Sequence, residues 1–233
     1  MWPQGVRSTS GETMRTRDQQ MRFGLGAAVL LAIMVTPALG SAQTEVSANV
    51  GWVSEYLYRG IPQKTSSGSV GLDIAGPNAS LGTWAADVGD GNEVDLYASV
   101  GTEYEGFSVS VGGIGYFYTG GFDDTYLEGN VNAGYGALSV EYSIGTYRTY
   151  TDHGTSAPQS YSFLGITLGG GGFYATYGTF GGDFEGRYFE TGYGLSVGDL
   201  DLSAAWVSSS KKLLGGAADN TLVVGVSHTI GIL

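Results

Sequence analysis

The stretch that decides the fold is SANVGWVSEYLYRGIPQ, residues 47–63. Side chains alternate between the two faces of a β-strand, so residues two apart share a face. One face of this strand, extended back to residue 46, is apolar and aromatic and carries Val46, Ala48, Val50, Trp52, Ser54, Tyr56 and Tyr58. The other face holds both charges and carries Ser47, Asn49, Gly51, Val53, Glu55, Leu57 and Arg59. The pattern predicts a strand between an apolar and an aqueous environment.

The same separation recurs in segments 93–104, 125–135, 138–147 and 200–209, where every charged residue lies on the polar face. A soluble β-sandwich also alternates, but its strands are usually about 5–6 residues long. These segments have roughly ten residues or more, the length that a tilted strand needs to cross a bilayer. A charge facing lipid would cost about 2–4 kcal/mol at the midplane. The pattern therefore favours strands that span a membrane.

Glycine-containing turns separate the segments, and short links alternate with generally longer ones. This alternation is typical of an outer-membrane barrel with tight periplasmic turns and longer outer loops. We predict an all-β fold, a transmembrane antiparallel up-and-down β-barrel of about 12 strands, with 10 or 14 as alternatives. The expected strands are 45–59, 68–75, 81–88, 93–104, 107–118, 125–135, 137–147, 161–168, 173–180, 187–195, 200–208 and 221–233.

The N-terminal region reads as a leader rather than as part of the barrel. Residues 21–42 have a basic start, an apolar run and small residues before a cleavage site after Ala42, as in a secretory signal peptide. Residues 1–20 are then an upstream extension or a misplaced start, and residues 43–233 form the barrel. Export and a barrel together predict the outer membrane of a Gram-negative bacterium, with outer-membrane lipid and the insertion machinery as partners. The oligomeric state is left open.

The net charge and the cysteine content exclude one class of partner and one kind of covalent stabilisation. The formal net charge is −12, and the leader carries more Arg than acid, so the exported part is more negative still. Such a surface repels nucleic acid, and we expect no nucleic-acid partner. The chain has no Cys, so a disulfide framework is excluded.

Aromatic residues are expected in two belts at the membrane interfaces. The belt near the short turns would contain Trp84, Tyr104, Phe107, Tyr135, Phe173 and Tyr193. The belt near the longer links would contain Tyr56, Tyr58, Phe117, Phe180 and Trp206.

Residues 47–63 also resemble the opening signature of the TorF-type porin family (Gcw_chp). That signature is Asn-Val-Gly, then Ser-Glu/Asp-Tyr, then aromatic-Arg-Gly and a nearby Gln. The matching residues are Asn49, Val50, Gly51, Ser54, Glu55, Tyr56, Tyr58, Arg59, Gly60 and Gln63. GLDIA (71–75), GTWAADV (82–88) and EVDLY (93–97) resemble the blocks that follow, whereas Ile61-Pro62 departs from the family pattern. The resemblance implies an outer-membrane barrel that conducts small solutes, with no defined substrate.

The polar face predicts what lines the lumen. The candidate pore-lining residues are Glu55, Arg59, Asp73, Asp87, Asp95, Glu103, Glu128, Glu141 and Asp201. A wet, acidic channel favours cations, so we expect a porin for small or cationic solutes. The alternative is a plugged lumen, in which Arg59 bridges several acids and Tyr97, Tyr126 and Tyr147 fill the gaps.

The charges of the opening stretch need partners elsewhere. Glu55 and Arg59 lie about 13 Å apart along one strand, too far for a direct ion pair. Partners on neighbouring strands, such as Asp73, are expected, in a charge constriction near the outer mouth or in a network that fixes strand register.

Catalysis is not expected. The mature chain has two His: His153 in a loop and His228 on the lipid-facing set. No nucleophile motif and no metal-ligand spacing is present, which predicts no enzyme, no cofactor and no metal site. The functional alternatives are a conducting porin, a structural outer-membrane barrel without transport and, third, a hydrolase.

Overall fold

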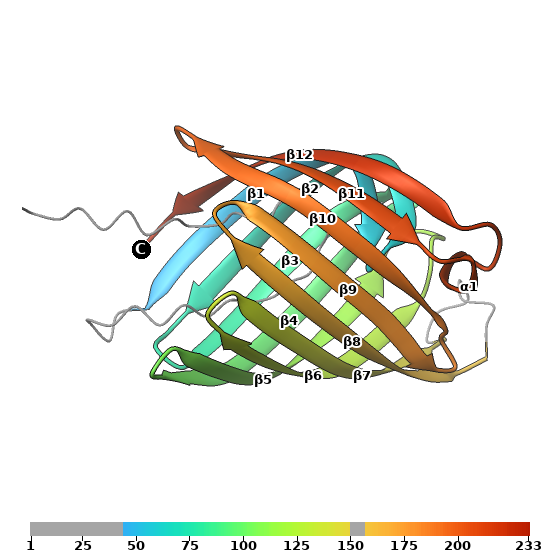
Figure 1. Cartoon of the computed structure of the whole chain (residues 1–233), viewed down its shortest axis with the longest axis horizontal. Helices are drawn as coiled ribbons and strands as arrows, with labels where there is room; N and C mark the ends of the chain where they lie inside the picture. Colours follow the sequence, from blue (N-terminus) through green and yellow to red (C-terminus); the bar gives the residue numbers. More distant parts are fainter. Residues whose placement is uncertain (1–43, 150–156) are drawn as a thin grey trace, which may run out of the picture.

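The computed structural model describes residues 44–149 and 157–233. The predicted signal peptide (21–42), the segment 1–20 and His153 lie outside the described residues. The described chain forms a closed barrel of twelve antiparallel strands in which each strand pairs with its sequence neighbours and β1 pairs with β12 (Figure 1). The predicted fold class and strand number are confirmed.

The strands are long enough to cross a bilayer at a tilt. Their bounds are β1 Glu45–Tyr58, β2 Ile61–Ala75, β3 Ala79–Gly89, β4 Gly91–Tyr104, β5 Phe107–Tyr118, β6 Thr125–Tyr135, β7 Leu138–Arg148, β8 Gln159–Gly170, β9 Phe173–Gly182, β10 Gly186–Val197, β11 Leu200–Ser209 and β12 Asp219–Gly231. One short helix, α1 (Lys211–Leu214), lies between β11 and β12. No helix among the described residues is both long and apolar enough to cross a membrane.

Links at the two ends of the barrel differ. At the end where β1 begins and β12 ends, the turn end, the links are 76–78, 105–106, 136–137, 171–172 and 198–199. At the opposite end, the loop end, the links between β5 and β6 and between β11 and β12 are longer (Figure 1). The alternation predicted from the sequence is present there.

Two loop-end links are shorter than predicted. β2 begins at Ile61, so the expected long link at residues 60–67 is wrong. Arg59 and Gly60 have φ values of 45° and 79°, and left-handed backbone at both central residues makes a tight two-residue hairpin turn. β3 and β4 are likewise separated by Asp90 alone.

The outside of the barrel is apolar. Large exposed hydrophobic side chains recur on every strand and include Val50, Leu72, Leu81, Leu96, Val111, Val131, Ile144, Leu168, Leu202 and Val224. Soluble proteins rarely expose an apolar surface of this extent, whereas lipid tails match it. The barrel therefore has the outer surface of a membrane-spanning protein.

The aromatic belts are correct only in part. Tyr104, Phe107, Tyr135, Phe173 and Tyr193 are exposed toward the turn end, and Phe117 and Trp206 are exposed toward the loop end. The remaining four predicted members, Trp84, Phe180, Tyr56 and Tyr58, lie inside the barrel. Trp84 pairs in register with Asp95, and Phe180 with Phe163, and all of these residues are buried on the inward phase of their strands.

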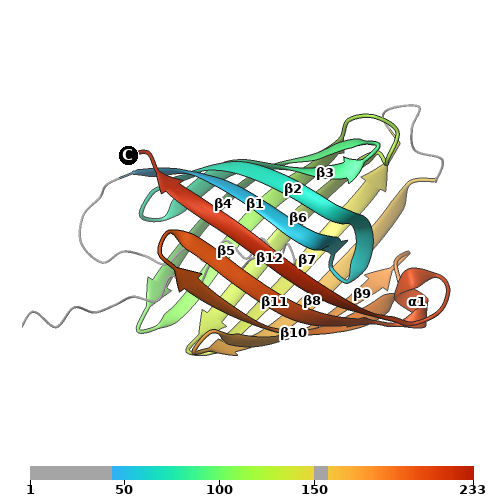
Figure 2. The same cartoon turned by 90° about the horizontal axis from the view of Figure 1, so that it is seen from above.

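Tyr56 and Tyr58 lie inside because the β1–β2 hairpin leaves the wall. β1 pairs with β12 only as far as Val53, and β2 pairs with β3 only from Ser69 onward. We call residues 54–68 the inserted hairpin. Its two arms continue to pair with each other while its end curls away from β12, which runs on toward α1 (Figure 2).

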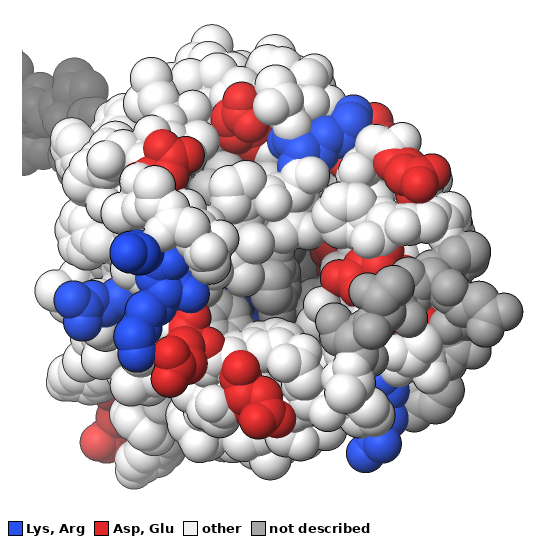
Figure 3. Space-filling model, turned by 90° about the vertical axis from the view of Figure 1, so that its right-hand side faces the viewer, with Lys and Arg blue, Asp and Glu red and all other residues white. Residues whose placement is uncertain are grey.

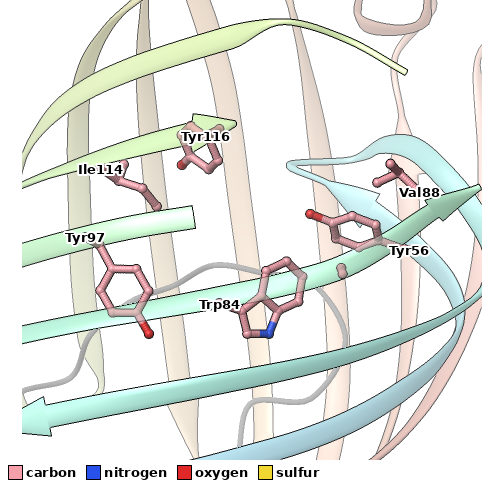
Figure 4. Packing of buried hydrophobic residues seen from close by; sticks show 7 residues of the cluster. Tyr56, Trp84, Val88, Tyr97, Ile114 and Tyr116 are labelled. Carbon is pink, nitrogen blue, oxygen red and sulfur yellow. The ribbon is translucent and has the colours of Figure 1, made fainter. Parts of the chain in front are cut away.

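The inserted hairpin is packed on both faces. The consecutive residues Tyr56 and Leu57 are each 3% exposed, which a strand in a barrel wall with one face to lipid would not show. Tyr56 belongs to a cluster on β3, β4 and β5 that includes Trp84, Tyr97 and Tyr116 (Figure 4). Leu57 belongs to a second cluster built from β8–β12. The two faces of the hairpin thus pack against different parts of the inner wall, one on β3–β5 and the other on β8–β12.

Candidate channel lumen

The inner wall carries many carboxylates. Alternation of burial along the strands places on the inward phase Asp73, Glu93, Asp95, Glu103, Glu128, Glu141, Glu190 and Asp201. Among the described strand and hairpin residues, the one positive side chain inside the barrel is Arg59. The loop end, viewed along the barrel, is hollowed near its centre, and acidic residues surround the hollow with basic residues in separate places among them (Figure 3).

Arg59, at the tip of the inserted hairpin, is held by two acids of the opposite wall. Its Nη1 lies 2.6 Å from Glu128 Oε1, and its Nη2 lies 2.9 Å from Glu128 Oε2, a bidentate pair. Its Nη2 also lies 2.7 Å from Glu141 Oε1. The guanidinium carbon is 4.0 Å from the ring centroid of Phe163. The charge of Arg59 is therefore fully engaged inside the barrel.

Hydroxyl groups complete this cluster. Tyr58 OH and Tyr161 OH donate to Glu128 Oε1 at 2.9 and 2.7 Å. Ser143 Oγ donates to Glu141 Oε1 at 2.9 Å. Because a buried ion pair is stable only when its remaining polar atoms are bonded, these donors fix both carboxylates in place.

A second group of acids lies on β4. Glu93 and Asp95 are fully buried on the same face, and Tyr56 OH donates to Glu93 Oε1 at 2.6 Å. Among the described residues, neither Glu93 Oε2 nor either Asp95 oxygen has a hydrogen-bond partner. Carboxylates without a positive partner are neutral only when they hold a proton or a mobile cation.

The remaining predicted residues lie in three places. Asp73 faces inward and accepts hydrogen bonds from Tyr97 OH at 2.5 Å and from Asn49 Nδ2 at 3.1 Å. It does not pair with Arg59, so its predicted role as a partner of that charge is wrong. Glu103 and Asp201 are on the inward phase near the turn end.

Glu55 and Asp87 belong to the loop end. Glu55 is half-buried on the inserted hairpin and accepts a hydrogen bond from Thr65 Oγ1 at 2.9 Å. Asp87 is on the outward phase of β3, because Ala86 and Val88 take the inward positions. Its side chain is 45% exposed and forms an ion pair with Lys64. Asp87 does not line the lumen, and that prediction is wrong.

The predicted pore-lining set did not include Glu93 or the two tyrosines of the inserted hairpin, Tyr56 and Tyr58. Glu93 shares the strand face of Asp95, and Glu190 lies on the buried inward phase of β10, so the period-two pattern was sufficient to find both. The period-two pattern could not find Tyr56 and Tyr58, because it places them on the same strand face as Trp52, which points outward. No set of three or more potential metal ligands is grouped in the described ranges.

Comparison with known proteins rests on structure. No family model matches the chain, and no curated protein matches its sequence. The structure is similar to that of the NanC porin, with a TM-score of 0.52 and 10% identity over 78% of this chain and 98% of that one. It is also similar to the COG4313 outer membrane channel from Pseudomonas putida F1, with a TM-score of 0.51 and 10% identity over 83% and 97% of the two chains. The chain has the fold of outer-membrane channels. At this identity the likeness establishes the fold, and the resemblance to the TorF family stays a prediction.

Proposed function

We propose that the protein is a porin of the Gram-negative outer membrane that passes small solutes by passive diffusion and prefers cations. The observation that carries the proposal is the partition of the barrel into an apolar outside and a carboxylate-rich inside. Apolar side chains match lipid, and inward carboxylates that solvent reaches, such as Glu103 and Asp201, are stable in contact with water and mobile ions. No described residue group points to catalysis, and we propose no enzymatic activity.

The charge balance of the lumen supports a preference for cations. Arg59 is neutralised by Glu128 and Glu141. Asp73, Glu103 and Asp201 add negative charge with no further inward base in the described residues. A negative lumen with low-dielectric walls concentrates cations and repels anions.

The inserted hairpin supports a narrow passage. It brings Tyr56, Leu57 and Arg59 into the lumen, where each is at most 5% exposed. Large solutes are therefore excluded while the hairpin is inserted.

Planar-bilayer recording tests the function. In a KCl gradient the purified protein should give discrete steps with a reversal potential that reports K⁺ preference. Glu103→Gln with Asp201→Asn should reduce that preference, because both acids are on the inward phase near the turn end. Asp87→Asn is the matched control and should leave selectivity unchanged, since Asp87 is on the outward phase. Anion selectivity in the unmodified protein would contradict the proposal.

A structural barrel without transport is the second candidate. The observation in its favour is the same inserted hairpin, which fills the lumen with packed side chains. Complete silence in bilayers from protein shown to be folded and inserted would favour this candidate.

A further inference from the structure

The inserted hairpin leaves two strand edges that side chains cover. On β12, the Val224 N–H donates to Ser54 Oγ at 2.9 Å instead of to a β1 carbonyl. The Asn220 N–H, on the same edge by alternation, donates to Asp219 Oδ1 at 2.8 Å. Side-chain caps of this kind satisfy backbone groups that a neighbouring strand would otherwise pair with.

The facing edge of β3 is capped in the same way. The Asp87 carbonyl accepts from Ser67 Oγ at 2.7 Å. The Gly89 N–H donates to Asp87 Oδ1 at 2.8 Å. The loop-end edges of β3 and β12 therefore face the place in the wall that β2 and β1 have left, and neither edge is paired with those strands there.

The existing registers fit the hairpin into that place. Val53 lies opposite Gly225, and continuing this register sets Tyr58 opposite Asn220. On the other arm, Ser69 lies opposite Ala86, and continuation sets Ser67 opposite Val88. Both edges would then be paired by backbone hydrogen bonds.

The side chains suit the wall position as well. In the wall, Tyr56 and Tyr58 would continue the outward face of the exposed Trp52 and join the interfacial aromatic residues. Arg59 would stay at the hairpin tip, at the barrel rim. The alternation of this stretch thus matches a membrane-facing strand, although in the described conformation both tyrosines are inside.

The point of departure has the marks of a hinge. Ser66 has a φ of 58°, which is rare for a residue with a side chain. It lies directly before the region where β2 rejoins β3, and its Oγ accepts from Trp52 Nε1 at 3.1 Å. The neighbouring Gly68 has space around its Cα, with no atom nearer than 3.9 Å to an added Cβ.

We propose that residues 54–68 are a gate with two positions. Inserted, the hairpin closes the lumen and is latched by Arg59 on Glu128 and Glu141. Paired into the wall between β3 and β12, it vacates the lumen and opens it. The gate is a regulation of the porin function proposed above and rests on it.

A cross-link that carries a disulfide in its spacer and fixes the inserted position tests closure. In that position Tyr58 and Tyr116 lie across the lumen with ring centroids 5.4 Å apart. The chain has no Cys, so Tyr58→Cys with Tyr116→Cys introduces the single thiol pair, which a short bifunctional thiol reagent bridges. Bridging should abolish open steps, and reduction of the spacer should restore them. Equal conductance of the fully cross-linked and the reduced protein would overturn the gate.

A direct disulfide captures the wall position. Tyr58→Cys with Asn220→Cys would be directly opposite in the continued register, at a Cα separation of about 5.5 Å that a disulfide accepts. In the inserted position Tyr58 instead packs on Tyr116 across the lumen, with ring centroids 5.4 Å apart. Mild oxidation should yield the cross-link and hold the channel open. The single variant Tyr58→Cys controls for the lost tyrosine. Absence of the cross-link would overturn the wall position.

Removing the positive charge of Arg59 tests the latch. Arg59→Gln should raise the open probability by about tenfold or more, because it removes the partner of two buried carboxylates. Arg187→Gln is the matched control, since Arg187 is an exposed base of β10 at the same end. No change in open probability for Arg59→Gln would exclude the latch.

The yield of each cross-link distinguishes a failure of the gate proposal from a failure of the porin proposal. Gel migration reports both cross-links without any conductance. If both cross-links form but no variant conducts, the hairpin moves and the barrel is not a channel. If the inserted-position cross-link forms, the wall-position cross-link does not, and conductance is steady, the protein is a channel and its hairpin is a fixed constriction.

Discussion

At the scale of single residues, the interior depends on tyrosine hydroxyls that donate to carboxylates. Tyr56 bonds Glu93, Tyr97 bonds Asp73 and Tyr174 bonds Glu190. A phenol has a large apolar body and one polar tip, so it fills space and still satisfies an acid. This pairing explains how a lumen with one inward base contains so many acids.

Tyr56→Phe tests this pairing. The change removes the 2.6 Å bond to Glu93, whose other oxygen already has no partner among the described residues. We expect a loss of about 1–3 kcal/mol in the free energy of unfolding, measured by urea titration in detergent micelles. Tyr104→Phe is the control, because Tyr104 is 74% exposed. Equal stability of the two variants would contradict the pairing.

At the scale of elements, the loop end is organised by contacts between neighbouring links. The β3–β4 turn packs on the β5–β6 loop, where the Thr119 N–H donates to Asn92 O and the Asn92 N–H to Thr119 Oγ1, each at 2.9 Å. Gly91 has a φ of 110°, and a Cβ there would lie 1.7 Å from Thr119 O. Only glycine allows this approach.

Gly91→Ala should therefore separate the two links. Gly136→Ala is the comparison, since Gly136 also has positive φ but no atom within 4 Å of an added Cβ. We expect Gly91→Ala to lower the free energy of unfolding by about 2 kcal/mol more than Gly136→Ala. Greater protease sensitivity of the β5–β6 loop in Gly91→Ala would accompany the loss. Matching stabilities would show that the contact is dispensable.

At the scale of the whole molecule, the arrangement of a soluble protein is reversed. The large apolar side chains that face outward, such as Val131, contact lipid, and polar side chains such as Asn132 face the lumen. The change in folding free energy that a substitution causes therefore depends more on which face of the strand carries the residue than on the chemical type of the new side chain.

Val131→Arg and Asn132→Arg place the same charge on neighbouring residues of opposite phase. Val131 lies near the middle of β6, so Val131→Arg should cost about 2–4 kcal/mol of insertion into lipid vesicles. Asn132→Arg should cost less, because its side chain faces the acidic lumen. The measurement is the fraction of heat-modifiable, folded protein on unboiled gels. A larger loss for Asn132→Arg would reverse the assignment of faces.

The sequence alone determined the barrel, its twelve strands and most of its inward acids. These features depend on local alternation, which lipid on one side and water on the other impose on every strand. Segments 68–75, 81–88 and 161–180 alternate weakly, yet the strand count was correct because glycine-containing turns marked the ends of these segments. Asp87 was misplaced because the local phase of β3 is set by Trp84 and Val88, which face inward although they are apolar.

Only the tertiary structure decided where the most characteristic stretch lies. Residues 54–59 alternate as a lipid-facing strand, yet Tyr56 and Leu57 are both buried inside the barrel. That position is fixed by the bond of Arg59 to Glu128 and Glu141, more than sixty residues away in sequence. Alternation reports the environment of a strand in the wall and contains nothing about partners across the lumen. Contacts between distant strands therefore determined where this stretch lies.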